Sequence, residues 1–244
     1  CDVLEATLGA DMVAYNEAAE LAERGFLTSS CCPAFVSYIR KSFPELQENI
    51  SHNMSPMATI AKRIKEKDPE AKTVFIGPCT AKKGEFQLPE VHKYVDCVLT
   101  FEELQAMFDS RELDVGAMEE TVLNNASGYG RIFAHCGGLA AAAAEALKEQ
   151  GIDFELKPLS CNGIEECKLA LMKAARGKLD ANFVEGMACV GGCVNGAGCM
   201  THNERNRVKV DAHSQQAQLK SITDSLLYAA EIDRELKEKA GDKA

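Results

Sequence analysis

Apolar residues follow two alternating patterns along the chain. Where they recur every three or four positions they predict amphipathic helices, and where they form short runs they predict buried strands. The predicted helices are Asp11–Arg24, Pro33–Phe43, a helix opening at Ser55-Pro56, a helix capped by Thr100, Leu139–Gln150, Ile164–Arg176 and a charged C-terminal helix from Ser214 to about Lys239. The predicted strands are Thr73–Gly77, which we expect to be buried, Asp96–Leu99, Arg131–Ala134, Phe154–Lys157 and Asn182–Glu185.

Local signals support the predicted helix ends. Pro33 stands at a position favoured in a first helical turn, and Pro44 stops the same helix. Glu103 follows Thr100 by three residues, which is the spacing of a capping box. Gly177 ends the helix before it.

The alternation of helices and strands predicts the fold class. It indicates an α/β fold made of two lobes of mostly parallel sheet flanked by helices, with a ligand site between the lobes. Such sheets bind ligands at the carboxyl ends of their strands. We expect residues 1–244 to form part of one domain, with a helical tail over about 214–244.

Composition excludes some classes of partner. The chain has 244 residues, 46% of them hydrophobic, which is enough for one substantial core. Its net charge of −10 argues against nucleic acid and against a basic membrane-binding surface. No apolar run reaches the roughly 18 residues of a membrane span.

Eleven cysteines are the main chemical feature of the chain. In an acidic, helix-rich protein of this size they favour metal-bound thiolates in a reducing, cytoplasmic compartment over a disulfide framework. Five of them lie in three Gly/Pro-rich loops, Thr28–Phe35, Gly77–Glu85 and Glu185–Gly196. Two of these loops follow predicted strands, so one shared metal site is expected.

Each loop taken alone leaves alternatives open. Cys189 and Cys193, separated by three residues with two glycines, suit either an iron–sulfur cluster or one half of a zinc site. Cys79 alone is equally consistent with a buried thiol beside solvated lysines. Cys31 and Cys32 begin a helix, where the dipole lowers the pKa of a thiol.

Together the three loops resemble the signature loops of the [FeFe]-hydrogenase catalytic domain, and the chain resembles the C-terminal two-thirds of that domain. The resemblance implies that Cys32, Cys79, Cys189 and Cys193 ligate a [4Fe–4S] cluster. It implies that Cys193 also bridges to a diiron subsite carrying CO, cyanide and azadithiolate, the two parts forming the H-cluster.

The same resemblance assigns roles to neighbouring residues. Lys82 would donate a hydrogen bond to a cyanide ligand, and Met187 would pack against the diiron subsite. Gly77 stands where other members carry methionine, which predicts open space or mobility beside that subsite.

The resemblance also implies a proton relay through Cys31, Glu17, Ser51 and Glu20. Both glutamates lie in Asn16-Glu-Ala-Ala-Glu-Leu21, which is similar to a Glu-Glu-Ala-Thr-Glu-Leu stretch of the family. Without the resemblance, Glu20 and Arg24 form an ordinary helical surface pair and Glu17 is a solvated carboxylate.

The function implied is reversible hydrogen oxidation and proton reduction. Its partners would be hydrogen and protons, a ferredoxin or fused iron–sulfur domains as electron carrier, and diiron maturation proteins. The alternatives are a hydrogen sensor with slow turnover and a non-catalytic iron–sulfur assembly protein. The family's domain normally begins before Cys1, so we expect the missing part on a longer chain or on another polypeptide.

Overall fold

The computed structural model describes residues 2–203 and 205–230. Its α-helices are α1 Thr7–Arg24, α2 Pro33–Ser42, α3 Pro56–Lys67, α4 Lys82–Glu85, α5 Pro89–His92, α6 Phe101–Asp109, α7 Gly128–Ile132, α8 Gly138–Glu149, α9 Ile164–Ala174 and α10 Arg205–Gln215. Short 3-10 helices cover Pro44–Asn49, Val115–Ala117 and Cys193–Asn195, and residues 222–230 are also helical. The strands are β1 Leu27–Thr28, β2 Val74–Gly77, β3 Cys97–Thr100, β4 Pro158–Asn162 and β5 Phe183–Met187.

Two parallel sheets organise the chain. β1, β5 and β4 form one sheet in that order, and β2 pairs with β3 in the other. Every residue of the central strand β5 is buried, as expected for a parallel strand covered on both faces. These parallel sheets flanked by helices confirm the predicted fold class.

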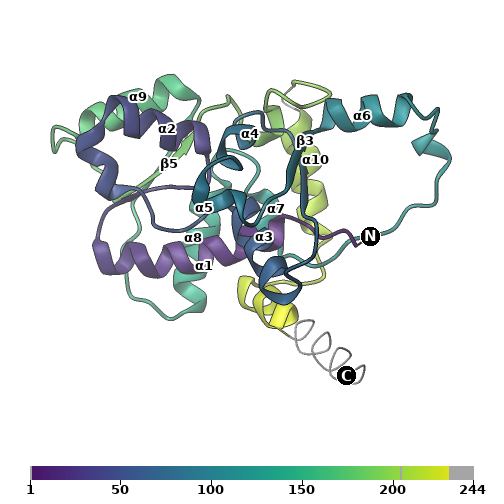
Figure 1. Cartoon of the computed structure of the whole chain (residues 1–244). Coiled ribbons are helices and arrows are strands. Elements are labelled where there is room, and N and C mark those ends of the chain that lie inside the picture. The colour runs from purple at the N-terminus through teal and green to yellow at the C-terminus, as the bar shows by residue number, and fades with distance from the viewer. Residues whose placement is uncertain (1, 204, 231–244) are drawn as a thin grey trace.

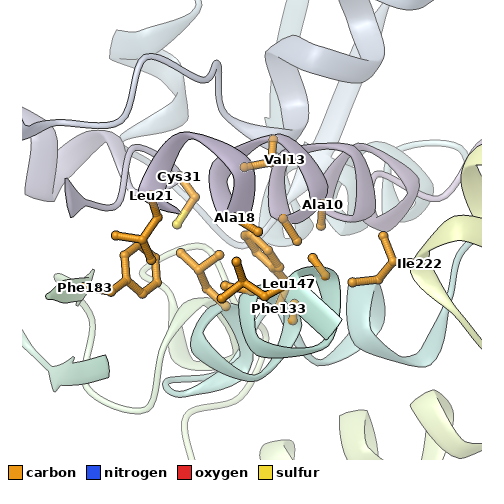
Figure 2. Close-up of a cluster of buried hydrophobic side chains, with 14 of the residues drawn as sticks. Ala10, Val13, Ala18, Leu21, Cys31, Phe133, Leu147, Phe183 and Ile222 are labelled. Carbon is orange, nitrogen blue, oxygen red and sulfur yellow. The ribbon is translucent and has the colours of Figure 1, made fainter. Parts of the chain in front are cut away.

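Helices cover both faces of the three-stranded sheet (Figure 1). On one face, α1 packs on the alanine-rich α8, where Ala142, Ala143 and Ala146 are fully buried and leave room for close helix contact. Figure 2 shows the resulting core, in which Cys31 lies with Leu21 and Phe183. A second core on the other face is formed by side chains of α2, α9 and β5.

Two predicted strands are wrong. Arg131–Ala134 begins inside α7, whose first turn is capped by the Ser127 hydroxyl accepting from Gly130 N. The segment is buried as a strand would be, since even Arg131 is buried and its charge is paired with Glu5 at 2.9 Å. Phe154–Lys157 is irregular, and the strand forms just after it, in β4.

Two other expectations need correction. Strand β2 forms as predicted but is not buried, since Val74 and Ile76 are 52% and 42% exposed. The C-terminal helix is not continuous: α10 ends at Gln215, residues 216–221 are not helical, and a new helix covers 222–230. Residues 231–239 of the predicted helix lie outside the described residues.

No helix within residues 2–203 and 205–230 combines the length and the apolar character needed to cross a membrane.

Candidate metal centre

All three cysteine loops follow the carboxyl end of a parallel strand. Cys31 and Cys32 lie between β1 and α2, Cys79 follows β2, and the loop of Cys189 and Cys193 follows β5. Strand β1 is too short for a clear sequence pattern, so only two of these three placements were predicted. The sheets thus bring together cysteines that are far apart in the sequence.

The loops enclose a cavity of about 120 Å³. Its lining contains every cysteine and neighbouring residue that the sequence singled out for the cluster: Cys31, Cys32, Cys79, Lys82, Met187, Cys189 and Cys193. Among the described residues, no three His, Cys, Asp or Glu side chains are placed to hold a single metal ion. Four thiols spread around a shared void suit a polynuclear cluster.

Glycines allow these loops to approach one another closely. A Cβ on Gly196 would lie 2.4 Å from the Pro78 carbonyl oxygen, and one on Gly198 would lie 2.6 Å from Thr100. Gly192 has a φ of 92°, and a Cβ on it would lie 2.7 Å from the backbone nitrogen of Cys136. The glycines are therefore required for the assembly of the cavity wall.

The electrostatics of the cavity favour a bound cationic group. Burial raises the pKa of Cys193, and the nearby Cys32 and Cys79 raise it further. Burial also raises the pKa of Cys79, against the opposing effect of Lys82, and the pKa of Cys189. Thiols crowded in this way ionise together only when positive charge lies between them, which iron provides.

Lys82 lies at the edge of the cavity and is buried. Its Nζ donates to Glu85 Oε2 at 2.7 Å and to the Cys31 carbonyl oxygen at 3.4 Å. An ammonium group has three donors, so one remains for a ligand in the cavity. Glu85 was not identified from the sequence, although a glutamate three residues after a lysine on a helix is a recognisable signal.

Met187 is the last residue of β5 and is 2% exposed. Gly77 does not open space beside the site, because the ring of Phe75 lies where its side chain would begin, at 2.7 Å. The predicted open space at Gly77 is therefore wrong, whereas the alternative of mobility stays a prediction.

The pKa of Cys31 is set by burial and not by the dipole of α2. It is buried among the apolar side chains between α1 and α8. Burial raises its pKa well above the ordinary thiol value, and the charge of Glu17 raises it further. The pKa lowering expected at a helix start is therefore wrong for Cys31, whose thiol keeps its proton at neutral pH.

Glu17 is fully buried, so it is not a solvated carboxylate. Neither of its oxygens makes a hydrogen bond of normal geometry to any described residue. Burial raises the pKa of Glu17 to about 8, although Ser51 and the Ser30 backbone act to lower it. A buried carboxyl with a pKa near neutrality can both accept and release a proton.

Ser51 is close enough to Glu17 to lower its pKa, and it makes a hydrogen bond to Glu20. It is held on the end of β1 by its backbone N–H, which donates to the Thr28 carbonyl oxygen at 2.9 Å. Its Oγ donates to Glu20 Oε2 at 2.8 Å, and Asn53 Nδ2 donates to both of these groups. Glu20 also binds Arg24 at 2.8 Å, so the predicted helical pair exists together with the contact to Ser51.

Similar structures are [FeFe]-hydrogenases. A variant of [FeFe]-hydrogenase HydA1 from Chlamydomonas reinhardtii superimposes with a TM-score of 0.68 at 21% identity, over 90% of this chain and 75% of that one. Another [FeFe]-hydrogenase gives a TM-score of 0.73 at 21% identity, over 96% of this chain and 80% of that one. At this identity the similarity shows the fold alone.

Similar sequences come from hydrogenases and from assembly factors. Iron hydrogenase 1 of Clostridium pasteurianum is 29% identical over 93% of this chain and 46% of its own length. The periplasmic [Fe] hydrogenase large subunit of Nitratidesulfovibrio vulgaris is 29% identical over 78% of this chain and 57% of its length. The cytosolic Fe-S cluster assembly factor NAR1 of Kluyveromyces lactis is 38% identical over 37% of this chain and 19% of its length.

The chain thus spans about half the length of the two hydrogenases. Residues 1–197 match the family model of the iron only hydrogenase large subunit, C-terminal domain, and the chain belongs to that family.

Proposed function

We propose that this chain is the cluster-binding part of an [FeFe]-hydrogenase that catalyses reversible hydrogen oxidation and proton reduction. The observation that carries the proposal is the shared cavity, which four candidate ligands line together with Cys31, Lys82 and Met187. A site that held only a cubane would need the four thiols and would have no use for the other three residues.

The four ligands are Cys32, Cys79, Cys189 and Cys193, which would hold a [4Fe–4S] cluster. Cys193 would also bridge to the diiron subsite with its CO, cyanide and azadithiolate ligands. When bound, this group supplies the centre at which protons and electrons combine to form hydrogen.

Two residues would orient the diiron subsite. Lys82 would donate a charge-assisted hydrogen bond to a cyanide, using the donor left free by Glu85 and the Cys31 carbonyl. Met187 would close the cavity with an apolar contact.

Protons would pass between the cavity and the surface through four groups in series. Cys31 Sγ would exchange its proton with Glu17, Glu17 with the Ser51 hydroxyl, and Ser51 with Glu20. The burial of Glu17 and the 2.8 Å contact from Ser51 to Glu20 support this order. The raised pKa of Glu17 suits a group that is alternately protonated and ionised near neutral pH.

The remaining partners follow from the family. A ferredoxin or other iron–sulfur domains would exchange electrons with the cubane, and maturation proteins would supply the diiron subsite. The cytoplasm is the proposed compartment; of the relatives, the NAR1 factor is named as cytosolic and the Nitratidesulfovibrio hydrogenase as periplasmic.

A second candidate function is iron–sulfur cluster assembly, as in the NAR1 relative. The local similarity, 38% over 90 residues, favours it. Under this alternative the cubane would be present and the diiron subsite absent.

The experiment is to load the protein through the diiron maturation machinery, record infrared spectra and measure hydrogen evolution from a reduced viologen. CO and cyanide bands with turnover support the hydrogenase. Bands with negligible turnover identify a hydrogen sensor, and the absence of bands with a retained cubane identifies an assembly protein.

The matched pair of variants is Cys31→Ala and Cys97→Ala. Both remove a free thiol, but Cys97 lies on β3 and does not line the cavity. Cys31→Ala should abolish turnover and keep the infrared bands, whereas Cys97→Ala should keep both. Turnover that survives Cys31→Ala contradicts the relay.

A further inference from the structure

The side chain of His52 lies at the outer end of the relay. Its ring Nδ1 is 3.1 Å from Glu20 Oε1, and its side chain is 73% exposed. Its backbone N–H also donates to both oxygens of Glu20, at 3.0 and 3.1 Å. The imidazole is therefore attached to the relay on one side and open to water on the other.

Glu20 itself is poorly suited to collect protons from water. Its side chain is only 13% exposed, and its oxygens accept from Ser51, Asn53, Arg24 and His52. Burial acts to raise the pKa of Glu20, but His52, Arg24 and Ser51 outweigh it and hold the pKa below the ordinary value. A carboxylate that is satisfied by so many donors needs a proton carrier beside it.

The other group bound to Glu20 from the surface cannot carry protons. Arg24 stays protonated at every physiological pH, so it can hold the carboxylate but cannot pass a proton to it. Imidazole exchanges protons near neutral pH and can take one at one ring nitrogen while releasing one from the other.

The exposed His52 also lines a large cleft. The cleft has a volume of about 760 Å³ and is lined by Ser51, His52 and Asn53. The other charged groups on its walls are Arg40 and Lys41 of α2, Glu48, Glu85 of α4 and Glu90 of α5. Glu20 is the carboxylate in contact with the His52 ring.

We propose that His52 is the solvent terminus of the proton relay, so that protons enter and leave through His52, Glu20, Ser51, Glu17 and Cys31 in that order. This inference rests on the proposed hydrogenase function. In the inward direction Nε2 of the neutral Nδ1–H ring first takes a proton from hydronium in the solvent, which leaves water. The Nδ1–H bond of the resulting imidazolium then breaks as a Glu20 O–H bond forms, which leaves the ring protonated at Nε2. Exchange of the ring protons with solvent restores the Nδ1–H tautomer, so the cycle is balanced and needs no further reactant.

The test compares His52→Gln with His213→Gln in the loaded protein. His213 is a matched control, since it is also exposed and lies 3.6 Å from a glutamate, Glu5, away from the relay. Glutamine keeps a donor for Glu20 but cannot exchange protons. We expect His52→Gln to lower turnover by about tenfold or more, as for loss of a general acid–base group, with infrared bands and iron content unchanged.

Added imidazole should restore turnover in His52→Gln and leave the wild type and His213→Gln unchanged. A purely structural role of His52 gives no such rescue. Unchanged turnover in His52→Gln, or a loss that imidazole does not repair, overturns the proposal. An inactive wild type with intact infrared bands overturns the hydrogenase function as well, so the two failures are distinguishable.

A second readout does not depend on turnover. Nitrogen chemical shifts of the ring at alkaline pH report which nitrogen is protonated, and the contact with Glu20 favours the Nδ1–H tautomer at His52. The Glu20→Gln variant should return the ring to the mixture of tautomers found for free imidazole. If the wild-type ring already shows that mixture, the contact does not form in solution and the proposal falls.

Discussion

The backbone N–H of Gly198 donates to the Pro78 carbonyl oxygen at 2.9 Å. This bond joins the loop of Cys193 to the loop of Cys79, which lie more than a hundred residues apart in the sequence. Gly196 packs on the same carbonyl, where a Cβ would approach to 2.4 Å. The geometry of the cluster site therefore depends on a backbone contact and on the absence of a side chain.

Gly196→Ala should separate these two loops. The overlap with Pro78 is with backbone, which cannot move aside as a flexible side chain would, so we expect a loss of about 1–3 kcal/mol in unfolding free energy. Iron bound per chain after reconstitution should fall with it. Gly84→Ala is the control, because a Cβ there meets nothing within 4 Å; equal iron loss in both variants contradicts the explanation.

The buried pair of Lys82 and Glu85 should be sensitive to the loss of one partner. Both side chains are 9% exposed and their contact is 2.7 Å. Glu85→Gln leaves the ammonium group buried without its counter-charge, which costs about 3–5 kcal/mol in similar pairs. Urea unfolding of the metal-free chain measures the loss.

Two comparisons isolate that effect. Glu145→Gln breaks a Lys–Glu pair of the same spacing, in which Lys148 is 76% exposed, and should cost less than about 1 kcal/mol. Adding Lys82→Met to Glu85→Gln should recover much of the stability but not hydrogen turnover. A loss at Glu85 no larger than at Glu145 contradicts the burial argument.

The sequence predicted which cysteine loops meet at one cavity better than it predicted the contacts around them. The cysteine loops carry their own signals, because glycine and proline at fixed offsets from cysteine are local features. Glu85 carries a local signal, its spacing of three residues from Lys82, but the sequence does not show that the pair is buried. His52 lacks such a signal, since its contact with Glu20 is created only by the fold.

The errors in secondary structure have a similar origin. Arg131 was placed in a strand because a four-residue run cannot distinguish a strand from a short buried helix. Its burial depends on Glu5, more than a hundred residues away. The C-terminal helix was extended through residues 216–221 because its charge pattern is continuous, whereas the second helix begins where Ile222 N and Thr223 N donate to Glu149 of α8.

Asp11 anchors the second of those helices to the core. Its carboxylate accepts from the Ser127 backbone N–H at 2.8 Å, the Ser127 hydroxyl at 2.6 Å and the Ser225 hydroxyl at 2.7 Å. Ser225→Ala should cost about 1.5–3 kcal/mol, the range for a hydrogen bond to a charged group. Ser214→Ala, which removes a bond within α10 only, is the control; urea unfolding and hydrogen exchange over residues 222–230 should separate the two.

Glu17 should make the stability of the chain depend on pH. Its pKa is raised from 4.5 to about 8 by burial, so the folded state holds a proton that the unfolded state releases. The stabilisation by the neutral carboxyl is complete below pH 4.5 and is lost progressively as the pH rises towards 8. The full loss is on the order of 4–5 kcal/mol as an upper bound.

Glu17→Gln removes this loss because the amide does not ionise. The unfolding free energy of the metal-free variant should therefore fall less than that of the wild type between pH 5 and about pH 7.5, below the range in which free thiols titrate. Glu23→Gln is the control, because Glu23 is exposed on the same helix, and its stability should depend on pH as that of the wild type does.

In the loaded protein Glu17→Gln should also lower turnover by about 10²–10⁴-fold, as expected for loss of a proton-transfer group, while the infrared bands remain. An unchanged pH dependence in Glu17→Gln would show that Glu17 is ionised in the folded state, which would exclude it as a carrier that holds a proton at neutral pH.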